Sequence, residues 1–144
     1  MAIWFKNFPM NYAKERGLGT MIDHLGIEIL EAGEDYLKGR MPVDERTRQP
    51  AGVLHGGASV AFAETLASWA ATFCVDPELH HCVGVEINAN HVRPATEGHV
   101  YGMARPVNLG RTLQIWEVRI ENDQGKLVCI ARVTMAVLKT ASQY

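Results

Sequence analysis

The stretch ASVAFAETLASWAATFC, from Ala58 to Cys74, contains a single charged residue, Glu64. Ala, Leu, Trp and Phe surround this glutamate at every helical spacing, so the stretch predicts a helix that is apolar on all faces and enclosed by the rest of the domain. Burying an ionised carboxylate without a partner costs on the order of 2–5 kcal/mol after relaxation. Chains bear such a cost mainly where chemistry requires it, which makes Glu64 a candidate catalytic residue. The alternative is a structural acid that pairs with an arginine.

Segments on both sides of this helix alternate apolar and polar residues with a period of two, which is typical of β-strands. Short connections, such as the turn at Asp123-Gln124-Gly125, predict antiparallel hairpins. The sequence therefore predicts an α+β fold, in which a curved antiparallel sheet of five to six strands wraps around one long central helix. The expected strands are Gly26–Glu31, Asp35–Val43, Cys82–Arg93, Gly98–Arg105, Arg111–Glu121 and Lys126–Leu138.

Three details of these strands can be tested directly. In the strand Cys82–Arg93, the alternation places Val83, Val85, Ile87 and Ala89 on one face. In the next-to-last strand the apolar parity changes near Trp116-Glu117, which predicts a β-bulge there. The segment Asn108–Gly110 is expected to form a loop before that strand.

The length of 144 residues suggests one domain. Residues 1–19 are expected to form an irregular or partly helical arm, followed by a single domain over residues 20–140. A short helix is predicted from Thr20 to Leu25, because Thr20 is a good N-cap and Asp23 follows three residues later. Phe62, Trp69 and Phe73 are expected in the core, although one of them could line a cavity.

Composition excludes several classes of function. The net charge of −2 gives no overall field that would attract nucleic acid. The N-terminus lacks the apolar region of a signal peptide, and no apolar run of about 18 residues predicts a spanning helix. The three cysteines lie in apolar contexts and have no metal-ligand spacing, so they are interpreted as reduced thiols. We therefore expect a cytoplasmic protein without a metal, a nucleic-acid partner or a membrane partner.

A long apolar strand at the edge of so small a sheet would be prone to pair with another chain. Pairing with a second copy across a two-fold axis satisfies that edge and gives a continuous sheet. The sequence therefore predicts at least a dimer.

The segment QPAGVLHGGASVAFAETLAS, from Gln49 to Ser68, resembles the signature of the hotdog-fold acyl-CoA thioesterases, in particular the branch that acts on aromatic acyl-CoAs such as 4-hydroxybenzoyl-CoA. The resemblance covers about residues 20–138. The chain resembles thioesterases that hydrolyse 1,4-dihydroxy-2-naphthoyl-CoA in menaquinone biosynthesis. It equally resembles their relatives that clear mischarged aryl groups in enterobactin synthesis. Further matching segments are HLGIE, MPVDERTRQP, INANHVRP, VNLGR and WEVRI.

The resemblance implies a thioester hydrolase with catalytic roles at Gln49, His55, Gly56, Glu64 and Ser68. Glu64 would act as nucleophile or as general base, two routes that the sequence does not separate. The Gly56 N–H, at the start of the helix, would stabilise the oxyanion. Glu64 follows Gly56 by eight residues, roughly 12 Å along one helix. Because that is too far for both to reach one carbonyl, the spacing predicts a composite site between two subunits.

Coenzyme A is part of the expected substrate, and no separate cofactor is expected. Arg93 and Arg111 are candidate partners for its phosphates, although strand-end arginines are often only solvated charges. The resemblance implies further CoA contacts, and a homodimer or a tetramer built as a dimer of dimers. The implied contacts are Gly84, His91, Val92, Arg93, Pro94, Asn108, Leu109, Gly110, Arg111, Thr112 and Leu113.

Two other functions fit the same fold. Hotdog-fold hydratases and dehydratases act on enoyl-CoA with a His/Glu pair, but their pattern tends to have Phe-Pro after the histidine. Here His55 is followed by Gly56. Non-catalytic acyl-CoA sensors carry a DNA-binding appendage and tend to lose the acid, whereas this chain has a short arm and retains Glu64.

Overall fold

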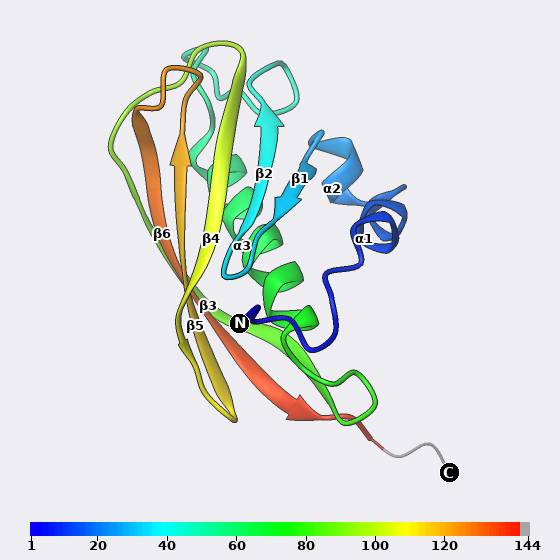
Figure 1. The fold of residues 1–144 in the computed structure, drawn as a ribbon. Coiled ribbons are helices and arrows are strands. Elements are labelled where there is room, and N and C mark those ends of the chain that lie inside the picture. The colour runs from blue at the N-terminus through cyan, green and yellow to red at the C-terminus, as the bar shows by residue number, and fades with distance from the viewer. Residues whose placement is uncertain (142–144) are drawn as a thin grey trace.

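The computed structural model describes residues 1–141. Six strands form one antiparallel sheet in the order β1-β2-β4-β5-β6-β3, and the sheet curves around the long helix α3, with α1 and α2 beside β1 (Figure 1). This arrangement confirms the predicted α+β architecture. The elements are α1 Met10–Gly17, α2 Met21–His24, β1 Glu28–Ala32, β2 Leu37–Pro42, α3 Gly56–Phe73, β3 His80–His91, β4 His99–Leu109, β5 Leu113–Glu121 and β6 Leu127–Lys139.

Two glycines let the sheet approach α3 closely. Gly39 of β2 pairs with Gly102 of β4, and both face the helix. A Cβ atom on Gly102 would lie 2.8 Å from Leu66 and 3.0 Å from Phe62, both of which are fully buried. The large side chains of α3 therefore occupy the space that side chains of the sheet would otherwise fill.

The prediction that α3 is enclosed on all sides is wrong for the single chain. Its sheet-facing positions are buried, but one stripe along the helix is only half-buried. Besides Glu64, this stripe contains small, hydroxyl and aromatic side chains rather than charged ones, so its composition resembles a core although the chain does not bury it. The stripe consists of Ala61, Glu64, Thr65, Ser68, Trp69 and Thr72.

The prediction that Val83 and Val85 share one face with Ile87 and Ala89 is also wrong, since only the latter two pack against the core. The exposed fractions of Val83 and Val85 are 41% and 61%, because β3 carries an irregularity between Gly84 and Glu86 where it pairs with β6. The extra residue shifts the side-chain parity, so that Gly84 faces α3 on one side of the irregularity and Ile87 packs against the core on the other. Since β3 pairs only with β6, its other edge is free among the described strands.

The β-bulge predicted in β5 lies instead in the neighbouring strand β4, between Pro106 and Asn108. In β5 every second side chain from Gln114 to Ile120 is buried, so the alternation does not change within this strand. The Trp116 Nε1–H donates to Gln114 Oε1 at 2.9 Å, which satisfies this polar side chain inside the core. The polar but buried Gln114 therefore interrupts the apolar pattern in the sequence, although the side-chain alternation of β5 itself does not change.

The turns agree with the predictions in part. β4 continues to Leu109, so the predicted loop at Asn108–Gly110 is wrong, and the turn comprises residues 110–112. The predicted turn at Asp123-Gln124-Gly125 is confirmed, with Gly125 at a φ of 73°. The alternation predicted for β6 is confirmed from Cys129 to Val137.

The N-terminal segment packs against the end of α3 and the hairpin between β1 and β2. The Phe5 N–H donates to Phe73 O at 2.8 Å, and the Trp4 indole donates to Gly33 O at 2.8 Å. Phe8 makes edge contacts with both Trp4 and Phe73. The division into an arm of residues 1–19 and a domain of residues 20–140 stays a prediction.

The predicted short helix is confirmed as α2, with Thr20 as its N-cap. The Thr20 hydroxyl accepts from the Ile22 N–H at 3.2 Å and donates to Gly17 O at 2.6 Å. We expect Thr20→Ala to lower the free energy of unfolding by about 1 kcal/mol, because both bonds are lost at the helix start. Urea denaturation measures this change, and Thr20→Ser, which keeps the hydroxyl, is the control that should retain most of the stability.

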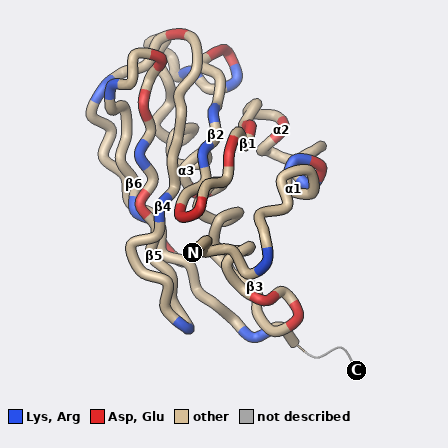
Figure 2. Tube along the Cα trace, viewed as in Figure 1, with Lys and Arg blue, Asp and Glu red and all other residues tan. Residues whose placement is uncertain are grey.

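No helix among residues 1–141 has the length and apolar character needed to cross a membrane. On the face seen in Figure 2, Lys and Arg are interspersed with Asp and Glu and do not gather in one basic patch.

Candidate active site

Glu64 lines a cavity of about 520 Å³ between α3, α2 and the residues that join α2 to β1. Three hydroxyl side chains share the cavity wall with it. Thr65 and Thr72 donate to helix carbonyls one turn back, at 2.7 Å each. Within the described residues the Ser68 hydroxyl has only a long contact, 4.0 Å to Met135 Sδ, so it is the hydroxyl available to a ligand beside Glu64.

The Glu64 carboxylate lies against Gly84 of β3. A Cβ atom at position 84 would stand 2.5 Å from Glu64 Oε1, closer than a methyl group can approach an oxygen. Glycine at this position therefore leaves the space that the carboxylate occupies. The predicted CoA-contact residue Gly84 thus lies next to the predicted catalytic acid.

The N-terminus of α3 is organised by His55 and the loop before it. The His55 N–H donates to Thr47 O at 2.8 Å, and His55 Nδ1 accepts from the Gly57 N–H at 2.8 Å. Because Nδ1 is the acceptor, a neutral His55 carries its proton on Nε2, where it can serve as a donor. The Gly56 N–H has no acceptor within residues 1–141, and it lies at the positive end of the helix dipole.

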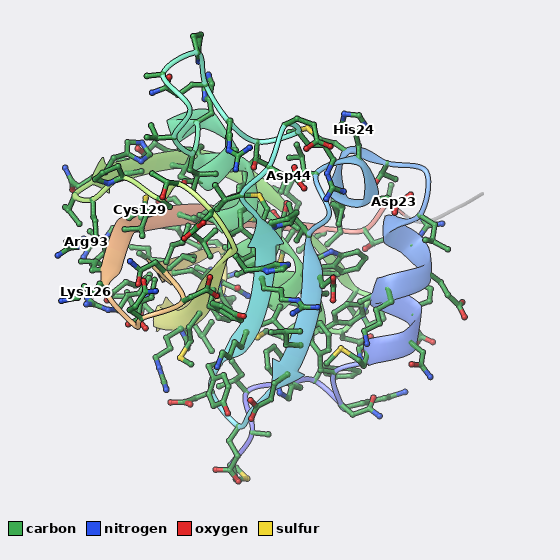
Figure 3. The ribbon with its side chains drawn as sticks, turned by 90° about the horizontal axis from the view of Figure 1, so that it is seen from above. Asp23, His24, Asp44, Arg93, Lys126 and Cys129 are labelled. Atoms are coloured by element: carbon green, nitrogen blue, oxygen red, sulfur yellow. The ribbon has the colours of Figure 1, made fainter. Side chains whose placement is uncertain are left out.

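A second cavity, of about 420 Å³, opens beside Gly56. A Cβ atom on Gly56 would lie 3.0 Å from the His91 imidazole, so the glycine lets the ring reach the helix start. Arg93, beside this cavity, lies on the opposite side of the molecule from α2 (Figure 3). The structure therefore brings together five predicted residues in this cavity wall: Gly56, His91, Val92, Arg93 and Pro94.

Gln49 and the segment Asn108–Leu113 lie apart from both cavities. Gln49 is half-buried in the loop before α3, and its side-chain oxygen accepts from the Ala51 N–H. The segment Asn108–Leu113 forms the tip between β4 and β5. Leu113 pairs with Ala136 and Ala136 pairs with Val83, so this tip lies at the Gly84 end of β3 rather than at the His91 end.

Within one chain, the site is thus split into two halves. Glu64 and Ser68 face one cavity, and the Gly56 N–H faces another, about 12 Å away along α3. One strand, β3, contacts both halves, through Gly84 at the acid and His91 at the amide.

The thioesterase superfamily matches residues 51–129, which include α3 and most of the sheet. A 1,4-dihydroxy-2-naphthoyl-CoA hydrolase of Escherichia coli is 44% identical over 94% of this chain and 99% of its own length. A proofreading thioesterase, EntH, of Cronobacter turicensis is 43% identical over 94% of this chain and 98% of its own. The crystal structure of a thioesterase from Haemophilus influenzae superposes with a TM-score of 0.94 at 43% identity, covering 99% of both chains.

The chain belongs to the thioesterase superfamily.

The resemblance inferred from the sequence is thereby confirmed, as are the hotdog fold and the assignment as an enzyme that hydrolyses thioesters.

The thioesterase's cysteines are all free. Burial raises the pKa of the Cys74 thiol to about 12 and that of Cys82 to about 11, so both stay protonated at neutral pH. The Cys82 thiol donates to Ala71 O at 3.5 Å. Among the residues described, His, Cys, Asp and Glu form no group of three that could hold a metal ion.

The cavity wall opposite Glu64 was not predicted from the sequence. Met21, Ile22, Leu25 and Ile27 line the larger cavity, and so does Trp69, which was expected in the core. Thr20 marked the start of α2, but nothing in the periodicity indicated that α2 would lie over α3. The sequence feature that could have indicated a cavity-lining role for Trp69 is its position on the same helix face as Glu64 and Ser68, since residues at such helical spacings share a face.

Proposed function

We propose that this thioesterase hydrolyses acyl-CoA with an aromatic acyl group, in a site that two copies of the chain form together. In this proposal Glu64 of one copy attacks or activates water, and the Gly56 N–H of the other polarises the thioester carbonyl. The observation that carries the proposal is that β3 contacts both halves of the site and has a free edge.

Antiparallel pairing of β3 with its copy would reverse the order of residues along the shared edge. Gly84 of one copy would then lie near His91 of the second copy. Since Gly84 adjoins Glu64 and His91 adjoins Gly56, the acid of each copy would come beside the amide of the other. The exposed Val83 and Val85 would gain cross-strand neighbours from the same pairing. A homodimer, or a dimer of dimers, is therefore part of the proposal.

The same reversal accounts for the two separated groups of CoA-contact candidates. The cavity formed by His91, Val92, Arg93 and Pro94 lies at one end of β3, and the tip Asn108–Leu113 lies at the other. In an antiparallel pair, the tip of one copy approaches the cavity of the second. We propose that Arg93 and Arg111, from different copies, bind the phosphates of one CoA.

The chemistry follows from the charges that develop during hydrolysis. Attack on the thioester carbon moves an electron pair onto the carbonyl oxygen, and an unpaired amide at a helix N-terminus stabilises that oxyanion. Either a Glu64 oxygen attacks, giving a mixed anhydride that water hydrolyses, or Glu64 removes a proton from the attacking water. In both routes the C–S bond breaks and CoA leaves as the thiol. Ser68, Gln49 and His55 would orient the carboxylate, the water or the acyl group.

Several observations favour this function over the alternatives. Membership of the thioesterase superfamily favours hydrolysis over hydration of an enoyl-CoA or binding alone. The aromatic acyl group is supported by the relative named as a 1,4-dihydroxy-2-naphthoyl-CoA hydrolase and by the apolar cavity beside Glu64. A role in menaquinone biosynthesis and a cytoplasmic location belong to the same proposal, the latter supported by the free cysteines.

A mixed-subunit experiment tests the composite site. Gly56→Pro removes the N–H at a first helical position that accepts proline, and Glu64→Gln removes the carboxylate. Each variant alone should be nearly inactive in a thiol-release assay on hydroxybenzoyl-CoA. Random assembly of equal amounts should restore about one quarter of the wild-type activity, because half of the dimers would contain one intact site of two.

Gly56→Ala is the matched control, because it keeps the N–H and adds the same first side-chain carbon beside His91. It should retain much more activity than Gly56→Pro. If the mixture is as inactive as its components, although heterodimers are present, the acid and the amide do not come from different subunits. A strictly monomeric, fully active protein would also refute the proposal.

A further inference from the structure

We propose that Trp69, together with Ile22 and Ile27, limits the length of the acyl group that the enzyme accepts. These three side chains line the cavity of about 520 Å³ that holds Glu64, and they also line a separate cavity of about 250 Å³ beneath α1. They therefore form the partition between the two spaces. The inference rests on the proposed function, because it assumes that the cavity beside Glu64 receives the acyl group.

The space behind the partition is suited to an apolar chain at its inner end. Its inner wall includes the buried residues Ala13 and Ile29, and its rim carries Lys14 and Glu28. A straight acyl chain that passed the partition would bury its far end there and gain transfer free energy for each methylene group. With the partition in place, a chain of that length has no room beyond Trp69.

Trp69 is held in position by other aromatic side chains. Its ring stacks on Phe73 with an interplanar angle of 2° and a centroid separation of 5.7 Å. Phe73 in turn contacts Phe8 at 5.1 Å and Tyr12 at 6.2 Å, both from the N-terminal segment. The partition is thus supported from the side of α1, which fixes the indole ring against displacement by a ligand. The expected preference is for compact, ring-shaped acyl groups over long straight ones.

Trp69→Ala should join the two cavities. We expect the ratio of kcat/KM for dodecanoyl-CoA to that for benzoyl-CoA to rise about tenfold or more, since each accommodated methylene contributes to discrimination. Calorimetric binding of S-dodecyl-CoA and S-benzyl-CoA, thioethers that cannot be hydrolysed, should show the same shift in Kd ratio. Adding Ala13→Leu to Trp69→Ala fills the second space, and should reverse the gain.

Thr72→Ala is the matched control, because Thr72 lines the larger cavity but not the smaller one. It should leave both ratios unchanged. A Trp69→Ala protein that keeps its fold by circular dichroism but shows no shift in the Kd ratio would overturn the inference; if it does not fold, Trp69→Leu and Ile22→Ala provide the same test. A shift in Kd ratio without hydrolysis of any acyl-CoA would instead refute the proposed function, but it would still support the partition.

Discussion

Replacing Glu64 with glutamine is expected to lower kcat for hydroxybenzoyl-CoA at least about a hundredfold, because the amide neither attacks a thioester carbon nor accepts a proton from water. Glutamine has nearly the same volume as glutamate, and position 64 is half-buried beside a cavity. The substitution should therefore leave the fold and the binding of substrate largely intact. Thiol release under saturating substrate measures kcat, and thermal unfolding verifies the fold.

Glu117→Gln is the control for this experiment. Glu117 is also half-buried, but it lies on β5 in a different cavity, where it pairs with Arg119 at 3.6 Å. Its substitution should leave kcat within about twofold of wild type, as is usual for a surface change away from the reacting atoms. Equal activity of Glu64→Gln and wild type would exclude Glu64 as the catalytic acid.

Gly84→Ala is expected to lower kcat by about a hundredfold as well, although residue 84 carries out no chemistry. Its methyl group would lie 2.5 Å from Glu64 Oε1, so the carboxylate must move by roughly 1 Å. A displacement of that size at a reacting group costs on the order of 10² in rate. Because alanine is a better strand residue than glycine, the thermal midpoint should not fall by much.

The division between kcat and KM distinguishes this effect from a loss of CoA contacts at residue 84. A displaced carboxylate lowers kcat and leaves KM nearly unchanged, whereas a lost binding contact raises KM. A Gly84→Ala enzyme with wild-type kcat and a raised KM would show that the carboxylate tolerates the methyl group, and that Gly84 acts only in binding. Size-exclusion chromatography verifies that the oligomeric state is unchanged.

The central helix and β6 were predictable because their apolar residues follow the helical and strand periods without interruption. β5 was predicted as a strand, but its side-chain parity was not, because Gln114 occupies a core position and is satisfied by Trp116, a pairing that the one-dimensional pattern cannot express. The orientation of Val83 and Val85 was missed for a related reason, since a single extra residue in β3 reverses side-chain parity.

The candidate site was predictable where its residues are contiguous in sequence. His55, Gly56, Glu64 and Ser68 all belong to one helix and its cap, so spacing alone places them. The partition is different, because Ile22 of α2 and Ile27, just before β1, come together with Trp69 of α3 only in the folded chain. Likewise, the contact of Glu64 with Gly84 joins residues of α3 and β3 and depends on how the strand crosses the helix.

Because β3 adjoins both the acid and the amide, catalysis in the proposed dimer depends on how two copies of that strand are aligned. A slip of two residues is the smallest that keeps every side chain on its own face of the sheet. Such a slip displaces one copy by about 7 Å along the strand, farther than any hydrogen bond can stretch. Dimers with shifted strands would then be folded and associated but catalytically inactive. The measured turnover rate would therefore depend on strand alignment as directly as on the chemistry.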